Sequence, residues 1–368
     1  YYGKAIYNNK EILAATNVLK RKSLTLIDGP SVKELEKKIA KLFGKKYGLM
    51  VNSGSSANLL GLASFNFKKG SEIITPSLTF STTISPIYHL GLVPHFIDVE
   101  KKTLGVDADK LSDYLKKNTR NYKGLCINKR TNRVIRAIVP THTFGHPFNI
   151  QKIIILSKKY NLKLIEDAAE SLGSFFHGKH TGTFGDMGIL SFNGNKTITT
   201  GGGGIILTNN KKYADQARHL TSTAKKKHSF ELIYNMIGYN YRLPNINAAI
   251  GCAQLEQIEL FLKSKRKLLK KYKKVFKEIP EVKLFIEPKD CRSNYWLQTI
   301  ILNKGSFELR NLILKMAKKK GIALRPVWKI LTSLPHFKFC PHMDVSNSKE
   351  LEKKIINLPS SSHLGFRL

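Results

Sequence analysis

An aspartate and a lysine stand out because each follows a short apolar segment that predicts a buried strand. Asp167 comes after the expected strand Leu162–Ile165, and Lys196 follows Ser191-Phe192 and precedes the glycine run Gly201–Gly204. Ligands bind at the carboxyl ends of strands in open α/β sheets, so both residues are candidates for catalysis. Each also has an ordinary interpretation, since an aspartate there often caps a helix or orders a loop, and most lysines are solvated.

Two predicted strand-to-helix turns add groups that bind anions and flat rings. The segment Asn52-Ser53-Gly54-Ser55-Ser56 begins a helix, where backbone amides and serine hydroxyls can bind a phosphate. The simpler interpretation of this segment is a serine N-cap. The second turn, Thr75–Phe80, ends on an aromatic ring that is either part of the core or a stacking platform.

Taken together and in this order, these groups match the needs of one cofactor, pyridoxal phosphate. Its phosphate needs amides and hydroxyls, and its ring needs a flat apolar face such as Phe80. Its pyridine nitrogen needs a carboxylate to stay protonated, for which Asp167 is placed, and its aldehyde needs a lysine to form a Schiff base, for which Lys196 is placed. The sequence therefore predicts a pyridoxal phosphate site.

The elements that must position these residues form an α/β pattern followed by a smaller unit. Expected strands are Tyr47–Val51, Glu72–Thr75, Val93–Val99, Val134–Val139, Leu162–Ile165, Ile189–Phe192 and Gly204–Leu207, and expected helices include Val32–Leu42, Ala57–Phe65, Phe80–His89 and Ile150–Tyr160. The strands lack alternation, which is typical of strands buried on both faces. We predict a large α/β domain over residues 1–245, with a mostly parallel central sheet.

A long helical pattern, Ile246–Ile279, leads out of this domain into a C-terminal α+β domain that we place at residues 246–368. Strand patterns follow at Val282–Ile286 and Tyr295–Leu302, and a helical pattern at Phe307–Lys320. The first 15 or so residues of the chain are expected to pack on this smaller domain.

The composition is that of a folded and strongly basic protein. Of the 368 residues, 62 are Lys or Arg and 26 are Asp or Glu, so the formal net charge is +36, and 42% of the residues are hydrophobic. Nucleic-acid-binding proteins share such a charge. The lysines are spread along the whole chain, however, and no nucleic-acid-binding motif accompanies them. We therefore expect a solvated basic surface and no dedicated nucleic-acid partner.

Membrane insertion, secretion and metal binding are not expected either. No apolar run reaches the roughly 18 residues that a membrane span needs, and the start of the chain has no signal-peptide pattern. The four cysteines are far apart and form no CxxC pair: Cys126, Cys252, Cys291 and Cys340. This spacing argues against a metal site and fits a reducing compartment, so we expect a cytoplasmic protein.

Beyond these patterns, several motifs resemble those of a known family. They are Glu166-Asp167-Ala168-Ala169-Glu170-Ser171-Leu172-Gly173, Gly182-Thr183-Phe184-Gly185-Asp186, Ser191-Phe192 with Lys196 and Thr199-Thr200-Gly201-Gly202-Gly203-Gly204, Gly238-Tyr239-Asn240-Tyr241-Arg242-Leu243-Pro244, and Asn247-Ala248-Ala249-Ile250-Gly251. From about Gly29 to Pro359 the chain is similar to the fold-type-I sugar aminotransferases of the DegT/DnrJ type. The segment Thr141–Pro147 and Arg325-Pro326-Val327-Trp328 look most like the branch that makes 4-amino sugars, as in legionaminic acid and perosamine synthesis. Residues 51–60 and 75–83 look closer to the branch that deoxygenates C-3 of nucleotide hexoses.

The resemblance implies roles for three residues in the chemistry. Lys196 would bond covalently to the cofactor and later carry the proton, and Asp167 would pair with the pyridinium nitrogen. Glu170 falls where many relatives have glutamine near the cofactor's 3-hydroxyl, where a carboxylate could accept that proton or repel the phenolate.

The resemblance implies five further cofactor-binding roles. Ser55 and Ser56 would offer amides, and Ser191 a hydroxyl, to the phosphate, while Phe80 would stack on the ring. Asn240 would reach the phosphate of the neighbouring subunit, which requires a homodimer with shared active sites.

The function implied is a pyridoxal phosphate-dependent aminotransferase, with pyridoxamine phosphate as an intermediate. It would move an amino group from glutamate to a keto carbon, with C-4 expected, of a nucleotide-linked 4-keto-6-deoxyhexose for surface-polysaccharide or glycan synthesis. The alternative is a pyridoxamine-dependent 3-dehydratase of the same fold, but such relatives carry histidine in place of the lysine. A regulatory or nucleic-acid-binding protein that merely keeps the fold has no need of Asp167, Lys196 and Asn240 together.

Overall fold

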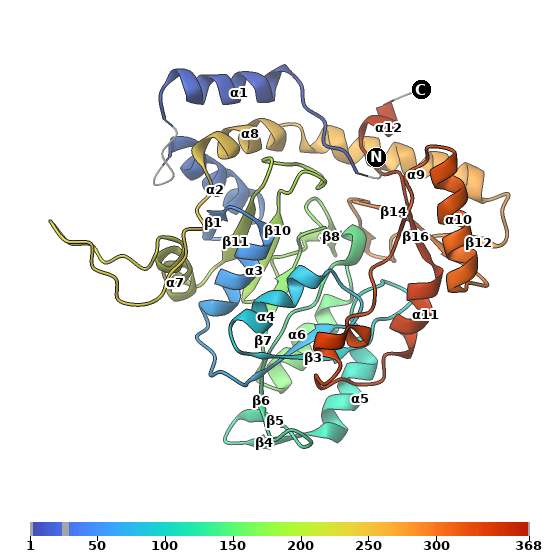
Figure 1. The fold of residues 1–368 in the computed structure, drawn as a ribbon, viewed down its shortest axis with the longest axis horizontal. Helices are drawn as coiled ribbons and strands as arrows, with labels where there is room; N and C mark the ends of the chain where they lie inside the picture. Colours follow the sequence, from blue (N-terminus) through green and yellow to red (C-terminus); the bar gives the residue numbers. More distant parts are fainter. Residues whose placement is uncertain (1–2, 24–28, 367–368) are drawn as a thin grey trace.

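A central sheet flanked by helices makes up most of the computed structural model, which describes residues 3–23 and 29–366 (Figure 1). Its strands run in the order β1-β11-β10-β7-β6-β2-β3, with β5 beside β6 and β4 beside β5. The strands are β1 (Tyr47–Val51), β2 (Glu72–Pro76), β3 (Val93–Ile97), β4 (Thr119–Tyr122), β5 (Leu125–Asn128), β6 (Val134–Ile138), β7 (Lys163–Asp167), β10 (Met187–Ser191) and β11 (Gly204–Thr208). From β10 to β3 all neighbours along this order are parallel, and β11 is antiparallel to β1 and β10. The sheet is mixed with a parallel centre, because β4, β5 and β6 also pair antiparallel, and the predicted α/β fold class is confirmed.

Helices separate many of these strands along the chain, and others precede or follow them. The helices are α1 (Asn9–Lys20), α2 (Pro30–Leu42), α3 (Gly54–Ala63), α4 (Ser85–His89), α5 (Ala108–Asn118), α6 (Ile150–Lys159), α7 (Lys211–Thr221), α8 (Asn245–Leu255), α9 (Ile258–Phe276), α10 (Phe307–Lys319), α11 (Ser346–Lys354) and α12 (His363–Phe366). Side-chain caps explain several starting points: Ser53 accepts a hydrogen bond from the Ser56 amide at the start of α3, and Asn210 accepts one from the Tyr213 amide at the start of α7. Such caps satisfy backbone amides that the helix itself leaves without a partner.

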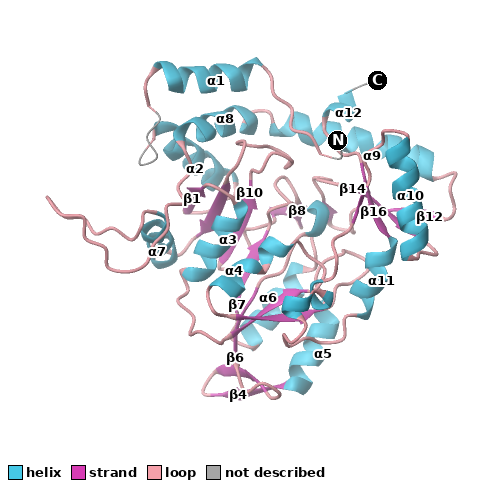
Figure 2. Ribbon diagram, viewed as in Figure 1, coloured by secondary structure: helices cyan, strands magenta, loops and turns pink. Residues whose placement is uncertain are grey.

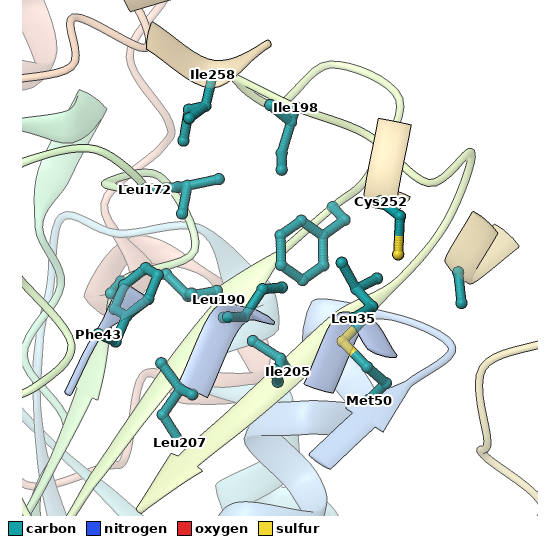
Figure 3. Packing of buried hydrophobic residues seen from close by; sticks show 14 of the residues in the cluster. Leu35, Phe43, Met50, Leu172, Leu190, Ile198, Ile205, Leu207, Cys252 and Ile258 are labelled. Atoms are coloured by element: carbon teal, nitrogen blue, oxygen red, sulfur yellow. The ribbon is translucent and has the colours of Figure 1, made fainter. Parts of the chain in front are cut away.

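Apolar side chains fill both faces of the sheet, which explains why its strands are apolar without alternation. Met50 of β1 belongs to a cluster with Leu35 of α2 and Cys252 of α8, whereas its neighbour Leu49 belongs to another cluster with Leu60 of α3. Figure 3 shows the first of these clusters, with Leu35, Met50 and Cys252 converging from different elements. Successive residues of a strand point to opposite faces, so each strand contributes to two cores.

The C-terminal part of the chain has a second sheet of its own. It runs in the order β12 (Val282–Leu284), β14 (Gln298–Leu302), β16 (Ile355–Leu358), β15 (Arg325–Pro326), with every neighbouring pair antiparallel. A third small sheet joins this part to the central one, since β13 (Cys291–Arg292) pairs with β8 (Phe175–Phe176), and β8 pairs with β9 (Lys179–His180).

The long helix predicted over Ile246–Ile279 is two helices, α8 and α9, with a turn at Glu256 and Gln257. The Gln257 side chain turns toward the N-terminal helix, where its Nε2 donates to Glu11 Oε1 at 2.6 Å. The apolar pattern is continuous although the helix is broken between α8 and α9. The break coincides with a contact from α1.

The start of the chain crosses to the later elements. Helix α1 lies along α8 (Figure 1), and the Gln254 side chain of α8 donates to Glu11 of α1 at 2.7 Å. The amide of Lys4 donates to the Ser361 hydroxyl at 2.6 Å. Within the described residues, no helix combines the length and the apolar character required to span a bilayer.

Candidate active site

A pocket of about 400 Å³ opens at the carboxyl ends of β7 and β10, beside the start of α3. Its lining combines carboxylates, a lysine, hydroxyls, glycines and aromatic rings. The lining residues are Ser53, Gly54, Ser55, Asn58, Phe80, Thr82, Thr83, Thr141, Asp167, Ala169, Glu170, Ser191, Asn193, Asn195, Lys196, Gly202, Gly203, Trp296 and Trp328. Residues distant in the sequence thus meet at the edge of the sheet where α/β proteins bind ligands.

Asp167, the last residue of β7, is buried and held from both sides of its carboxylate. Its Oδ2 accepts hydrogen bonds from the Thr83 hydroxyl at 2.7 Å and from Asn58 Nδ2 at 3.3 Å, while its Oδ1 accepts the Ala169 amide at 3.1 Å. Donors on both oxygens fix the direction of this carboxylate, so a group in the pocket meets it in one orientation.

The start of α3 forms an anion-binding corner. Helix geometry leaves the amides of Gly54 and Ser55 outside the intrahelical hydrogen bonds, and the Ser55 and Ser191 side chains line the pocket here. A Cβ atom on Gly54 would come within 2.8 Å of the Ser191 Cβ, so the close approach of the two segments requires glycine.

Ser56 belongs to the capped start of α3, and its predicted amide contact with a phosphate stays a prediction. Its amide donates to the Ser53 hydroxyl at 3.0 Å, and its own hydroxyl donates to Asn52 Oδ1 at 2.6 Å. It is absent from the described residues that line the pocket, and both of its polar groups belong to the N-cap of α3. Ser53, which takes the capping role, lines the pocket in its place.

Lys196 lies between a carboxylate and an aromatic ring. Its Nζ is 3.7 Å from Glu170 Oε1 and 3.9 Å from the centre of the Trp296 ring. Burial lowers the pKa of the Lys196 ammonium from its ordinary value, although the charges of Glu170 and Asp167 oppose the change. A larger fraction of this amine is therefore unprotonated, and nucleophilic, than in a solvated lysine.

Glu170 is the second titratable group beside this amine. Burial raises the pKa of its carboxyl to about 7, against the opposing effects of the Lys196 charge and the Phe144 amide. That amide donates to Glu170 Oε2 at 2.8 Å, and Phe144 has a left-handed backbone with φ 57°. The bond to Glu170 therefore supports a conformation that a non-glycine residue rarely adopts.

Phe80 lies at the pocket and not in the core, which excludes the core interpretation of this residue. Its side chain is 48% exposed, and the centre of its ring is 6.2 Å from that of Trp328. Trp328 in turn contacts Phe144, with ring centres 5.0 Å apart. An exposed aromatic face at a polar pocket can stack on a planar ligand.

Asn240 is outside the pocket of its own chain. It is exposed and forms a bridge with Ser222 at the base of a segment, residues 225–240, that extends away from the body of the molecule (Figure 2). The predicted contact of Asn240 with a neighbouring subunit stays a prediction.

Among the pocket residues that received no role from the sequence are Asn58, Thr83, Trp296 and Trp328. For Asn58 a signal existed, because it follows Gly54 by one helical turn and shares its face of α3. Trp296 precedes β14 in the second sheet and has no local pattern that links it to Lys196.

The chain is similar to proteins of one family along almost its whole length. Residues 6–366 match the DegT/DnrJ/EryC1/StrS aminotransferase family. The chain is 34% identical over 340 residues to a putative pyridoxal phosphate-dependent aminotransferase, EpsN, of Bacillus subtilis, covering 91% of this chain and 84% of that protein. It is 35% identical over 336 residues to the GDP-perosamine synthase of Escherichia coli O157:H7, covering 90% and 85%. The structure of E. coli GDP-4-keto-6-deoxy-D-mannose-3-dehydratase with bound hydrated PLP superposes with a TM-score of 0.86 at 28% identity, covering 98% and 95%.

The fold and the pocket thus define an aminotransferase of the pyridoxal phosphate-dependent class. The chain belongs to the DegT/DnrJ/EryC1/StrS aminotransferase family, which confirms the predicted family, fold type, enzyme class and cofactor.

Proposed function

We propose that the chain transfers an amino group from glutamate to the C-4 keto carbon of a nucleotide-linked 4-keto-6-deoxyhexose. The single observation that carries the proposal is Lys196: a buried lysine with a lowered amine pKa lines the same pocket as Asp167 and the start of α3. Relatives are named both GDP-perosamine synthase and GDP-4-keto-6-deoxy-D-mannose 3-dehydratase, and both names contain a GDP-linked sugar. A nucleotide sugar is therefore the substrate class that we assign.

The residues present fit pyridoxal phosphate. The phosphate would lie at the start of α3, against the amides of Gly54 and Ser55 and the Ser191 hydroxyl. These groups are hydrogen-bond donors, and none of the three residues carries a carboxylate that would repel the phosphate. Asp167 would hold the proton on the ring nitrogen, and Phe80 would cover one face of the ring. The bound cofactor supplies an electron sink for the carbon that loses its proton.

The chain's own part in the reaction centres on one amine. Lys196 Nζ would hold the cofactor covalently in the resting enzyme, and once released the amine would take the proton from the donor substrate and carry it within the pocket. Because burial lowers the pKa of Lys196, the released amine would act as a base more readily than a solvated lysine. Glu170, with a carboxyl pKa of about 7, can hold a proton beside it.

We assign a homodimer with shared active sites, in which Asn240 completes the phosphate site of its partner. The segment of residues 225–240 carries Phe230 and Ile237 with 93% and 89% of their surfaces exposed. Such a cluster of exposed apolar side chains on a projecting segment fits an interface with a second copy of the chain better than open solvent. A cytoplasmic location accords with the four free cysteines.

Product analysis tests the function. Purified enzyme is incubated with pyridoxal phosphate, glutamate and a panel of nucleotide 4-ketosugars, and the products are identified by mass and NMR. We expect a 4-amino sugar and one equivalent of 2-oxoglutarate per turnover, with neither product from Lys196→Ala. A 3-deoxy sugar formed with ammonia would instead establish the dehydratase.

A further inference from the structure

The ring beside the catalytic lysine has no role in the chemistry described so far. Trp296 is 5% exposed, and the Lys196 Nζ lies 3.9 Å from the centre of its ring, on a side chain that is itself largely buried. We propose that Trp296 is a positioning residue that holds the free ammonium of Lys196 on its ring face. The inference rests on the proposed function only in taking Lys196 as the residue that bonds the cofactor.

The physical basis is that, among the residues the structure describes, few other groups act on the buried Lys196 ammonium. The charged groups that act on Lys196 are Glu170, at 3.7 Å, and Asp167. An ammonium has three N–H donors, and the negative face of an indole attracts a cation more strongly when water is excluded. An aliphatic residue in this position would leave the same ammonium against hydrocarbon, which disfavours the charged form.

The Trp296 ring is itself fixed to the loop that carries the lysine. Its Nε1 donates to the backbone carbonyl of Asn195 at 2.8 Å, and Asn195 directly precedes Lys196. The Trp296 amide donates to Asn294 Oδ1 at 2.7 Å, so the backbone is held as well. The ring and the ammonium are therefore kept in one relative position by a contact that spans the two sheets.

A buried lysine of α9 extends this support. The Lys265 Nζ donates to the Trp296 carbonyl at 3.2 Å and to the Ser360 carbonyl at 2.7 Å. The C-terminal sheet and α9 thereby set the position of the ring, which gives this part of the fold an influence on the charge state of the catalytic amine.

The test titrates Lys196 in the apoenzyme, where cofactor chemistry plays no part. Reductive methylation with formaldehyde and cyanoborohydride modifies only unprotonated amines, and mass spectrometry of the Lys196 peptide follows its rate against pH. The variants are Trp296→Phe and Trp296→Leu, with Trp328→Phe as the matched control, because Trp328 lines the same pocket. We expect the midpoint to fall by about one pH unit in Trp296→Leu, by less in Trp296→Phe, and to stay unchanged in Trp328→Phe.

The graded order of the variants separates the ring face from other contributions. Both substitutions remove the bond to Asn195, so equal shifts in Phe and Leu would assign the effect to that bond and overturn the proposal, as would no shift in either. If Trp296→Leu does not fold, Trp296→Met supplies the aliphatic side chain. Borohydride trapping of the cofactor on Lys196 of the wild type is measured separately, so failure of the proposed function is distinguished from failure of this inference.

Discussion

Replacing Asp167 by asparagine removes one negative charge from the end of β7 while nearly preserving the shape of the side chain. The asparagine Oδ1 can still accept the Ala169 amide, which is 3.1 Å from the carboxylate in the wild type. Its amide nitrogen would replace the oxygen that accepts from both Thr83 and Asn58. The Thr83 hydroxyl can rotate to accept, since Thr79 Oγ1 lies 3.2 Å away as an alternative partner, and only the longer bond from Asn58, at 3.3 Å, is lost. We therefore expect the variant to fold and to bind pyridoxal phosphate.

The expected loss in rate follows from the missing charge. Two opposite unit charges about 4 Å apart attract by roughly 4 kcal/mol at an effective dielectric constant near 20. A carboxylate opposite the ring nitrogen favours the protonated ring by about this amount, and 1.36 kcal/mol corresponds to a factor of ten. The Asp167→Asn variant should therefore convert glutamate about 10³-fold more slowly than the wild type.

Single-turnover absorbance measurements with glutamate provide the assay. Thr83→Val is the matched control, because it removes one hydrogen bond to the same carboxylate, 2.7 Å long, and leaves the charge in place. A hydrogen bond to a charged group contributes about 1.5–3 kcal/mol, so the control should lose roughly one to two powers of ten. If Asp167→Asn binds the cofactor and retains a rate within tenfold of the wild type, the proposed role of the charge is refuted.

Three further predictions concern the other site residues. Lys196→Ala should lose the peptide that borohydride labels with the cofactor, and Lys196→Arg should not restore it, because a guanidinium remains protonated; a label on another lysine would contradict the assignment. The Glu170 pKa is raised to about 7, so its contribution to stability is present at low pH and lost as the pH rises through 7. Between pH 5 and pH 8, the free energy of unfolding of the apoenzyme, measured in urea, should fall by about 2 kcal/mol less in Glu170→Gln than in the wild type. An equal fall in the two proteins would contradict the raised pKa. Mixing inactive Lys196→Ala with weakened Asn240→Ala should restore activity, since one site of the mixed dimer has both residues intact; a fully active monomer in ultracentrifugation would exclude the shared site.

Buried strands were the part of the fold that the sequence predicted best. Tyr47–Val51 matches β1 at both ends, and Gly204–Leu207 is one residue shorter than β11. Both strands pack apolar side chains on two faces, so a short apolar run bounded by polar or small residues is sufficient to locate them. The break between α8 and α9 was missed, because a partner from the distant residue Glu11 leaves no mark in the local pattern.

In the site, too, residues with a local sequence pattern were predicted, and residues that act through contacts with distant parts of the chain were missed. Asp167 ends one strand of the central sheet and Lys196 lies shortly after another, where topology alone suggests a ligand. Thr83 and Trp296 act on these two residues through side-chain contacts at 2.7 Å and 3.9 Å, and neither contact has a sequence signature. Ser56 was assigned to the phosphate because a serine at a helix start suits both an anion and a cap. Its hydrogen bonds to Ser53 and Asn52 lie within the cap, and the phosphate contact stays a prediction.

The choice between amino transfer and dehydration depends on what the side chain at position 196 can do. A lysine amine would hold the cofactor covalently, and once free it would move a proton. A histidine could move a proton but could not form that bond, so it would suit a reaction that needs only proton transfer from this position. Lys196 has Glu170 at 3.7 Å and Trp296 at 3.9 Å to hold it after its release. A pocket that supports a free ammonium in this way is suited to a lysine that leaves and returns in each half-reaction, which is the requirement of amino transfer.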